Sequence, residues 1–223
     1  MKGIFLKEIY TLRSLWKSWL VVMGILAFNG IVTENAGLMY SAVTMIGLMC
    51  TMTSFGYDSS SRWETLALSL PVTREQMVRC RYWVGAASMG IVAAALLPAS
   101  LLMIIFSEKV NPVELLASFY GCLVAGLLML AVLIPTIYRF GVEKARYLYL
   151  ALIGGVGVLI YGLIRMYAWM DEASAALSGA RQALDWLAER NAAFWAAASG
   201  LAALAGLYVS YLISVRIYAE KEF

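Results

Sequence analysis

Side chains that commonly carry out catalysis are scarce in this sequence of 223 residues. Histidine is absent, which removes the commonest general base and the commonest metal ligand. The three cysteines, Cys50, Cys80 and Cys122, are too few and too scattered for a zinc site or a disulfide framework. Neither a G-x-S-x-G nucleophile motif nor a G-x-x-x-x-G-K-S/T phosphate loop occurs. We therefore expect no catalytic residue, no metal site, no cofactor and no ATP hydrolysis by this chain itself.

Residue types suited to binding a partner are concentrated in one polar segment, residues 58–81. Ser-Arg-Trp-Glu at 61–64 and Thr-Arg-Glu-Gln at 73–76 both have the spacing of a helix-capping box. Pro71 between them predicts a helix stop. We expect a short helix over 62–69 and a second helix that runs into the next apolar run.

The short helix carries an apolar stripe formed by Trp63, Leu66 and Leu70. A cytoplasmic partner protein or this protein's own inner loops could cover the stripe. Alternatively, the helix could lie on the membrane surface. The spacing of these residues does not choose between the two.

Composition shows what kind of elements must position this segment. The chain is 62% hydrophobic and 14% charged, against about 45–50% and 25% in soluble domains. Six runs lack Asp, Glu, Lys and Arg and approach the length of about 20 residues that crosses a bilayer. They are 18–33, 35–57, 82–107, 115–138, 147–164 and 191–215. Because runs such as 90–97 do not alternate as barrel strands do, we expect an all-α membrane protein with six transmembrane helices in a single domain, 1–223.

The basic residues predict the orientation of these helices. With the N-terminus inside, the inner segments hold 13 of the 17 Lys and Arg residues, and the outer segments hold 4. The acidic residues divide evenly, so the net charge is +6 inside and −3 outside. Cytoplasmic segments carry such an excess of Lys and Arg. We therefore expect both termini, and the segment 58–81, to be cytoplasmic.

Residues 1–17 are too charged to span the membrane. Wound as a helix, they gather Ile4, Phe5, Ile9, Leu12, Leu15 and Trp16 on one arc, continued by Trp19. Most of the basic and hydroxyl side chains lie on the other arc, and Glu8 is the exception. We expect an interfacial amphipathic helix whose basic face meets anionic membrane lipid. A ragged extension of the first span is the alternative.

The outer segment 165–190 also shows helical periodicity. Leu177, Ala180, Leu184 and Leu187 share one face, and charged side chains occupy most of the rest. We expect an extracellular helix here, and a solvated connector is the alternative.

Inside the spans no Asp, Glu, Lys or Arg lies at mid-membrane, which disfavours proton relays and voltage sensors. Small residues recur four apart, as in Ala86/Gly90 and Gly121/Ala125, and predict close helix packing. The second span carries four methionines, an adaptable side chain that suits varied apolar partners. They are Met39, Met45, Met49 and Met52. Both packing of the bundle and lining of a pathway are compatible with this pattern.

Two stretches of the sequence resemble a known family. The opening MKGIFLKEIYTLRS, with its Lys7-Glu8 pair, is similar to the start of small bacterial permease subunits of ATP-binding cassette (ABC) exporters of the ABC-2 type. YDSSSRWETLALSLPVTREQMVRCRY at 57–82 resembles their segment in which a Trp-Glu pair precedes a Leu-Pro-Val-Ser/Thr-Arg stretch. The similarity covers essentially the whole chain.

The resemblance implies roles that the spacing does not show. The helix between spans two and three is a coupling helix that docks on a separate cytoplasmic ABC ATPase. The docking residues are then Arg62, Trp63, Glu64, Leu66, Leu70, Pro71 and Arg74. Two permeases, identical or different, and two ATPases form one exporter, and the second and fifth spans face the pathway. The methionines of span two and Gly155 of span five are then pathway candidates.

We therefore predict a permease subunit in the bacterial cytoplasmic membrane that moves a hydrophobic or amphipathic cargo, peptide or lipid-like, out of the cell. We expect no nucleic-acid partner. A membrane enzyme is disfavoured because the spans lack buried acids and histidines. A non-transporting immunity or regulatory membrane protein is the alternative, and it could share every feature except the docking segment.

Overall fold

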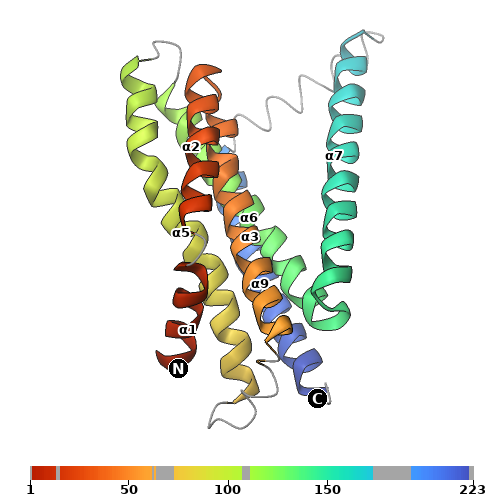
Figure 1. Ribbon diagram of the computed structural model, residues 1–223. Coiled ribbons are helices and arrows are strands. Elements are labelled where there is room, and N and C mark those ends of the chain that lie inside the picture. The colour runs from red at the N-terminus through yellow and green to blue at the C-terminus, as the bar shows by residue number, and fades with distance from the viewer. Residues whose placement is uncertain are drawn as a thin grey trace. The chain divides into compact units, whose positions relative to one another are not determined.

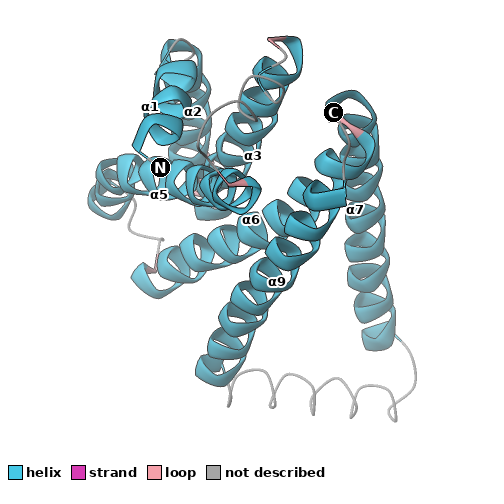
Figure 2. Ribbon diagram, turned by 90° about the horizontal axis from the view of Figure 1, so that it is seen from below, coloured by secondary structure: helices cyan, strands magenta, loops and turns pink. Residues whose placement is uncertain are grey.

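The computed structural model describes residues 2–13, 16–61, 63, 73–106, 111–172 and 192–220. These residues form helices and no strand (Figure 2). The helices, labelled in Figure 1, are α1 (Lys2–Arg13), α2 (Trp16–Val32), α3 (Ala36–Ser60), α5 (Arg74–Phe106), α6 (Pro112–Phe140), α7 (Val142–Glu172) and α9 (Ala192–Glu220). The all-helical prediction is therefore confirmed for this part of the chain.

Among the described residues, five helices are long and apolar enough to cross a membrane: α3, α5, α6, α7 and α9. Helix α2 is also apolar but has 17 residues, at the lower limit of lengths that span a bilayer, about 17. Five of the six predicted spans are thus supported by length and composition, and a sixth crossing by α2 remains a prediction. Most of the predicted outer helix, residues 173–190, lies outside the described residues.

Side-chain caps explain where several helices begin. The Asn35 side chain accepts a hydrogen bond from the Leu38 amide at 3.0 Å and starts α3. The predicted capping box at 73–76 is confirmed, because Thr73 and Gln76 each bond the other's backbone amide. These bonds satisfy donors that the first turn of a helix leaves without partners.

The points at which α3 and α6 end also have identifiable causes in the sequence. The hydroxyl of Ser61 donates to the Tyr57 carbonyl at 2.8 Å and closes α3, although the sequence predicts that Ser61 caps the next helix. Gly141, with φ of +80°, separates α6 from α7. A residue with a Cβ is strained in that conformation, which is why glycine is suited to this junction.

By packing, the chain divides into two units. Unit 1 comprises residues 1–142 and 203–223, and unit 2 comprises residues 143–202. Helix α7 and the first turns of α9 belong to unit 2.

In unit 1, α3 is the central helix and packs against α1, α2, α5 and α6. Its contact with α2 is close, because a Cβ added to Gly30 would lie 2.6 Å from the Met39 Cβ. By contrast, Gly90 and Gly121 have nothing within 4 Å of an added Cβ among the described residues. A close approach therefore occurs at Gly30 and not at Gly90 or Gly121, which the four-residue spacing favours.

Helix α1 and the last turns of α9 lie at the same end of unit 1 (Figure 1). The Arg74 guanidinium at the start of α5 donates to the Ala219 carbonyl at 2.7 Å and to the Tyr218 carbonyl at 3.3 Å. These bonds place the beginning of α5 beside the end of α9. Helix α1 and the end of α9 therefore lie on one side of unit 1, and the cytoplasmic location of this side stays a prediction.

Candidate functional site

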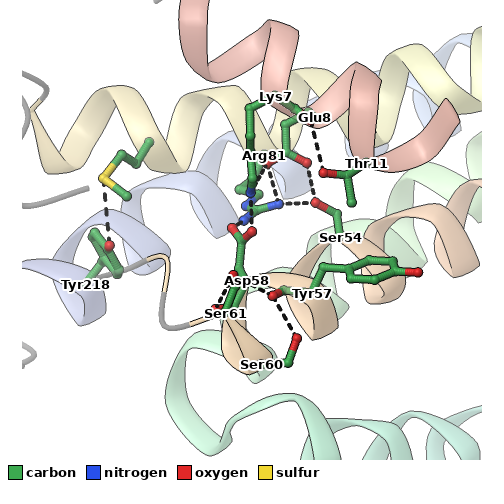
Figure 3. Close-up of polar contacts among 11 residues, drawn as sticks. Lys7, Glu8, Thr11, Ser54, Tyr57, Asp58, Ser60, Ser61, Arg81 and Tyr218 are labelled. Atoms are coloured by element: carbon green, nitrogen blue, oxygen red, sulfur yellow. Dashed lines mark hydrogen bonds and ion pairs between the residues drawn. The ribbon is translucent and has the colours of Figure 1, made fainter. Parts of the chain in front are cut away.

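Four charged side chains and one hydroxyl meet at the α1 end of unit 1 (Figure 3). Lys7 and Glu8 come from α1, Ser54 and Asp58 from α3, and Arg81 from α5. We call these five residues the ionic cluster. They join three helices whose residues lie up to 74 positions apart in the sequence.

Arg81 is the residue that connects the two acids. Its guanidinium lies 2.8 Å from Glu8 Oε1 and forms a second ion pair with Asp58. It also donates to the Ser54 hydroxyl, which in turn donates to Glu8. The carboxylates of Glu8 and Asp58 therefore each form an ion pair with Arg81.

Lys7 completes the cluster from the opposite side. Its ammonium lies 3.2 Å from Glu8 Oε1 and donates to Asp58. Two cations and two anions therefore alternate, and the cluster has no net charge. Such neutrality is required because an unpaired charge in a dry environment carries a large desolvation penalty.

Burial shows how dry this environment is. Glu8 is 1% exposed and Asp58 is 3% exposed. Burial lowers the pKa of the Lys7 ammonium below its ordinary value, the nearby Arg81 charge lowers it further, and Glu8 opposes both. Weak screening at such a site makes the ion pairs sensitive to small displacements of one helix against another.

Helical spacing explains how the sequence brings these groups together. Ser54 and Asp58 are four residues apart and share one face of α3. On α5, Arg81 lies two turns after Arg74, where the helix begins. Glu8, the acidic exception on the amphipathic arc of α1, points towards these residues and away from water.

An aromatic chain extends the cluster towards two more helices of unit 1. The Arg81 guanidinium lies over the Phe55 ring at 4.5 Å from its centroid. Phe55 packs edge-on against Tyr138 of α6, and Tyr138 packs against Tyr218 of α9, both with centroids 5.2 Å apart. Cation–π and aromatic pairs each contribute about 0.5–1.5 kcal/mol. Every helix that the structure describes in unit 1, except α2, therefore contributes a residue at this level.

The described part of the predicted docking segment touches the cluster. The Lys7 ammonium lies 4.8 Å from the centroid of the Trp63 ring, which is half-buried. Arg74 also belongs to the segment, and its guanidinium bonds α9. The other predicted docking residues lie outside the described residues. They are Arg62, Glu64, Leu66, Leu70 and Pro71.

The pathway candidates fall into two groups. Met39 and Met52 are buried in the packing of unit 1, whereas Met45 and Met49 are 49% and 44% exposed. Gly155, in unit 2, is exposed and has nothing within 4 Å of an added Cβ among the described residues. Met45 and Met49 therefore have accessible side chains in unit 1.

Sequence reasoning missed the ionic cluster as a site. It placed Asp58 and Arg81 at the two ends of a polar segment, whereas Asp58 is a buried residue of α3 and the Arg81 side chain, on α5, is 10% exposed. Two signals were present: the acid on the otherwise apolar arc of α1, and charged residues next to long apolar runs. Neither signal identifies which distant charge pairs with which.

Comparison with known proteins adds the family. A family model described as an ABC-2 family transporter protein matches residues 3–219. No curated protein and no solved structure matches the chain. The match includes the whole ionic cluster and all of the described helices except the first residue of α1 and the last residue of α9. The chain therefore belongs to the ABC-2 transporter family, as a multi-pass membrane component that works with an ABC ATPase.

Proposed function

We propose that this chain is the permease subunit of an exporter and that residues 58–81 receive the movement of a separate cytoplasmic ATPase. The observation that carries this proposal is the contact between Trp63 and Lys7. Through it, the docking segment is connected to a buried cluster shared by α1, α3 and α5.

The cluster is suited to transmitting such a movement. Its ion pairs are short and dry, so they favour a small number of discrete arrangements over gradual deformation. A displacement of Trp63 by ATP-driven closure of the ATPases acts first on Lys7. Lys7 shares both acids with Arg81, so the displacement continues into α5 and α3. ATP binding then selects between conformations of the permease.

The cargo that we propose is hydrophobic or amphipathic. The long apolar helices offer no described Asp, Glu, Lys or Arg at mid-span to hold an ionic cargo. Met45 and Met49 offer exposed, adaptable apolar surface instead. In this proposal a second permease subunit completes the pathway, to which the exposed Gly155 also contributes.

Co-purification with the ATPase tests the docking step. We expect Trp63→Ala to lower recovery of the ATPase and its stimulation by the permease, because truncating an aromatic anchor at an interface costs at least about 2 kcal/mol. Trp83→Ala is the matched control, since Trp83 is 67% exposed on α5. Full recovery of ATPase by Trp63→Ala would contradict docking through this residue. Absence of any ATPase from the purified wild type would favour a non-transporting protein.

A second variant tests transmission separately from docking. Lys7→Met removes the cation beneath Trp63 but leaves the docking segment intact. We expect normal ATPase recovery and reduced stimulation of hydrolysis. Lys144→Met is the control, because Lys144 is exposed on α7 and lies outside the cluster. Stimulation equal to that of the wild type would show that the cluster does not transmit the movement.

Uptake of a labelled amphipathic peptide into inside-out vesicles that contain both subunits tests the pathway. Met49→Trp and Gly155→Trp should block uptake while ATPase recovery stays normal. Val21→Trp, at a 62% exposed position of α2, is the control. Normal uptake by both variants would place the pathway elsewhere.

A further inference from the structure

An apolar hollow of about 380 Å³ opens between α1, α2, α3 and α5 of unit 1. Its deeper wall includes Ile46 of α3 and Val92 of α5, and its outer wall includes Leu20 and Met23 of α2. The hydroxyl of Ser88, which also lines it, already donates to the Gly85 carbonyl. The hollow is therefore lined almost entirely by hydrocarbon.

The hollow has one polar end. Arg13 and Trp16 line it at the junction of α1 and α2, whereas Met23 and Ala95 line it about two turns further along. On α5, the lining extends from Ser88 to Ala95, a rise of roughly 10 Å. An apolar space that extends along about two turns of helix and has an arginine beside it matches a molecule with a hydrocarbon tail and an anionic head.

A buried donor without an acceptor lies near that polar end. The indole Nε1 of Trp19 is buried and has no hydrogen-bond partner among the residues that the structure describes. Leaving such a donor unsatisfied costs about 1–3 kcal/mol. Trp19 lines the hollow, and a rotation of its ring would turn this covered N–H towards an acceptor carried by an occupant.

The charge at the polar end is complementary to a phosphate. Arg13 is exposed and forms no ion pair within the described part of the chain. Lys17, one turn further on, is exposed as well. Guanidinium groups bind phosphate oxygens through paired, charge-assisted hydrogen bonds. Trp and Tyr rings prefer the headgroup level of a membrane, where Trp16 and Trp19 then lie.

From these observations we infer that the hollow is a binding site for one anionic membrane phospholipid. One acyl chain occupies the apolar space along α5, an ester carbonyl accepts from the Trp19 indole, and the phosphate pairs with Arg13. The volume lies near the lower end of small-molecule pockets, roughly 300–1,000 Å³, which fits one chain. A resident lipid would hold α1 and α2 against α3 and α5, next to the ionic cluster.

Native mass spectrometry of the purified full-length chain, titrated with phosphatidylglycerol or phosphatidylcholine, tests this inference without the ATPase. We expect one phosphatidylglycerol to bind more tightly than phosphatidylcholine. Trp19→Phe keeps the ring but removes the N–H, and should weaken binding about threefold to tenfold. Arg13→Ala should weaken it roughly tenfold or more, because its hydrogen bonds are charge-assisted.

Controls separate the site from general lipid affinity. Trp83→Phe and Arg139→Ala alter exposed residues that do not line the hollow, and should bind phosphatidylglycerol as the wild type does. Ala95→Trp should abolish binding by filling the space. If the Ala95→Trp variant fails to fold, Trp19→Phe and Arg13→Ala still test the inference. Three results would each overturn the inference. The wild type could bind both lipids equally, or the Trp19→Phe and Arg13→Ala variants could bind phosphatidylglycerol as tightly as their controls. A peptide that co-purifies with the chain and is not displaced by phosphatidylglycerol would be the third.

Discussion

Removing Arg81 is the most informative perturbation of this protein. Arg81→Met keeps the approximate length and apolar stem of the side chain and deletes only the guanidinium. Glu8 and Asp58 then share Lys7 alone, so the cluster changes from neutral to a net charge of −1. Both acids remain buried, at 1% and 3% exposure, and water cannot readily compensate them.

The expected magnitude follows from this burial. Removing one partner of a buried ion pair costs about 3–5 kcal/mol, because an uncompensated charge remains in a dry site. For a chain of this length, 1 kcal/mol corresponds to roughly 2–4 °C in Tm. We therefore expect Arg81→Met to lower the Tm by roughly 6–20 °C. Arg79→Met is the matched control, since Arg79 pairs with Glu75 on the exposed side of the same helix.

Thermal unfolding in lipid nanodiscs, followed by near-UV circular dichroism, measures the difference. Adding Asp58→Asn to Arg81→Met restores a neutral cluster, so the double variant should be more stable than Arg81→Met alone. Residues in one ion-pair network usually couple by at least about 0.5 kcal/mol. The reasoning is refuted if Arg81→Met and Arg79→Met unfold at the same temperature, or if the effects of Arg81→Met and Asp58→Asn simply add.

Three further predictions concern packing, hydrogen bonding and orientation. Gly30→Ala should destabilise the protein by about 1–3 kcal/mol, because the new Cβ meets the Met39 backbone at 2.9 Å, whereas Gly24→Ala meets nothing within 4 Å and should be neutral or stabilising in the same unfolding assay. Tyr82→Phe removes the hydroxyl that lies 2.6 Å and 2.8 Å from the Ser210 and Ser214 hydroxyls. It should cost about 0.6–1.7 kcal/mol, and an unchanged Tm would contradict a bond between α5 and α9. In a background without Cys50, Cys80 and Cys122, a cysteine at Glu34 should react with a membrane-impermeant thiol reagent in intact cells, and one at Ser60 should not; the reverse pattern would overturn the orientation.

Much of the fold could be predicted from local patterns. The long apolar runs correspond to helices because a bilayer-spanning segment must satisfy its own backbone hydrogen bonds. The capping box at Thr73 was predictable for a similar reason, since both of its bonds join residues three apart. The end of α3 at Asp58–Ser60 could not be predicted in this way, because Ser61, which closes the helix, also fits the start of a following helix.

The ionic cluster lies beyond such patterns. Glu8 meets Ser54 and Arg81 across 46 and 73 residues, and a helical period does not specify which helices are neighbours. The close contact at Gly30 was missed for the same reason. A glycine permits close approach wherever it faces another helix, and only the packing shows that Gly30 faces Met39 while Gly90 faces open space.

The order in which the chain is synthesised gives the ionic cluster a further consequence. When α3 has been made, Lys7, Glu8 and Asp58 are already present, and they leave one carboxylate without a counter-charge. Arg81 emerges more than twenty residues later, on α5. The N-terminal helices therefore cannot complete their assembly as a separate unit, even though the apolar side chains of α3 have already been synthesised. Translation and insertion of α5 supply the missing cation, so the biogenesis of the first half of this protein finishes only when its fourth described helix arrives.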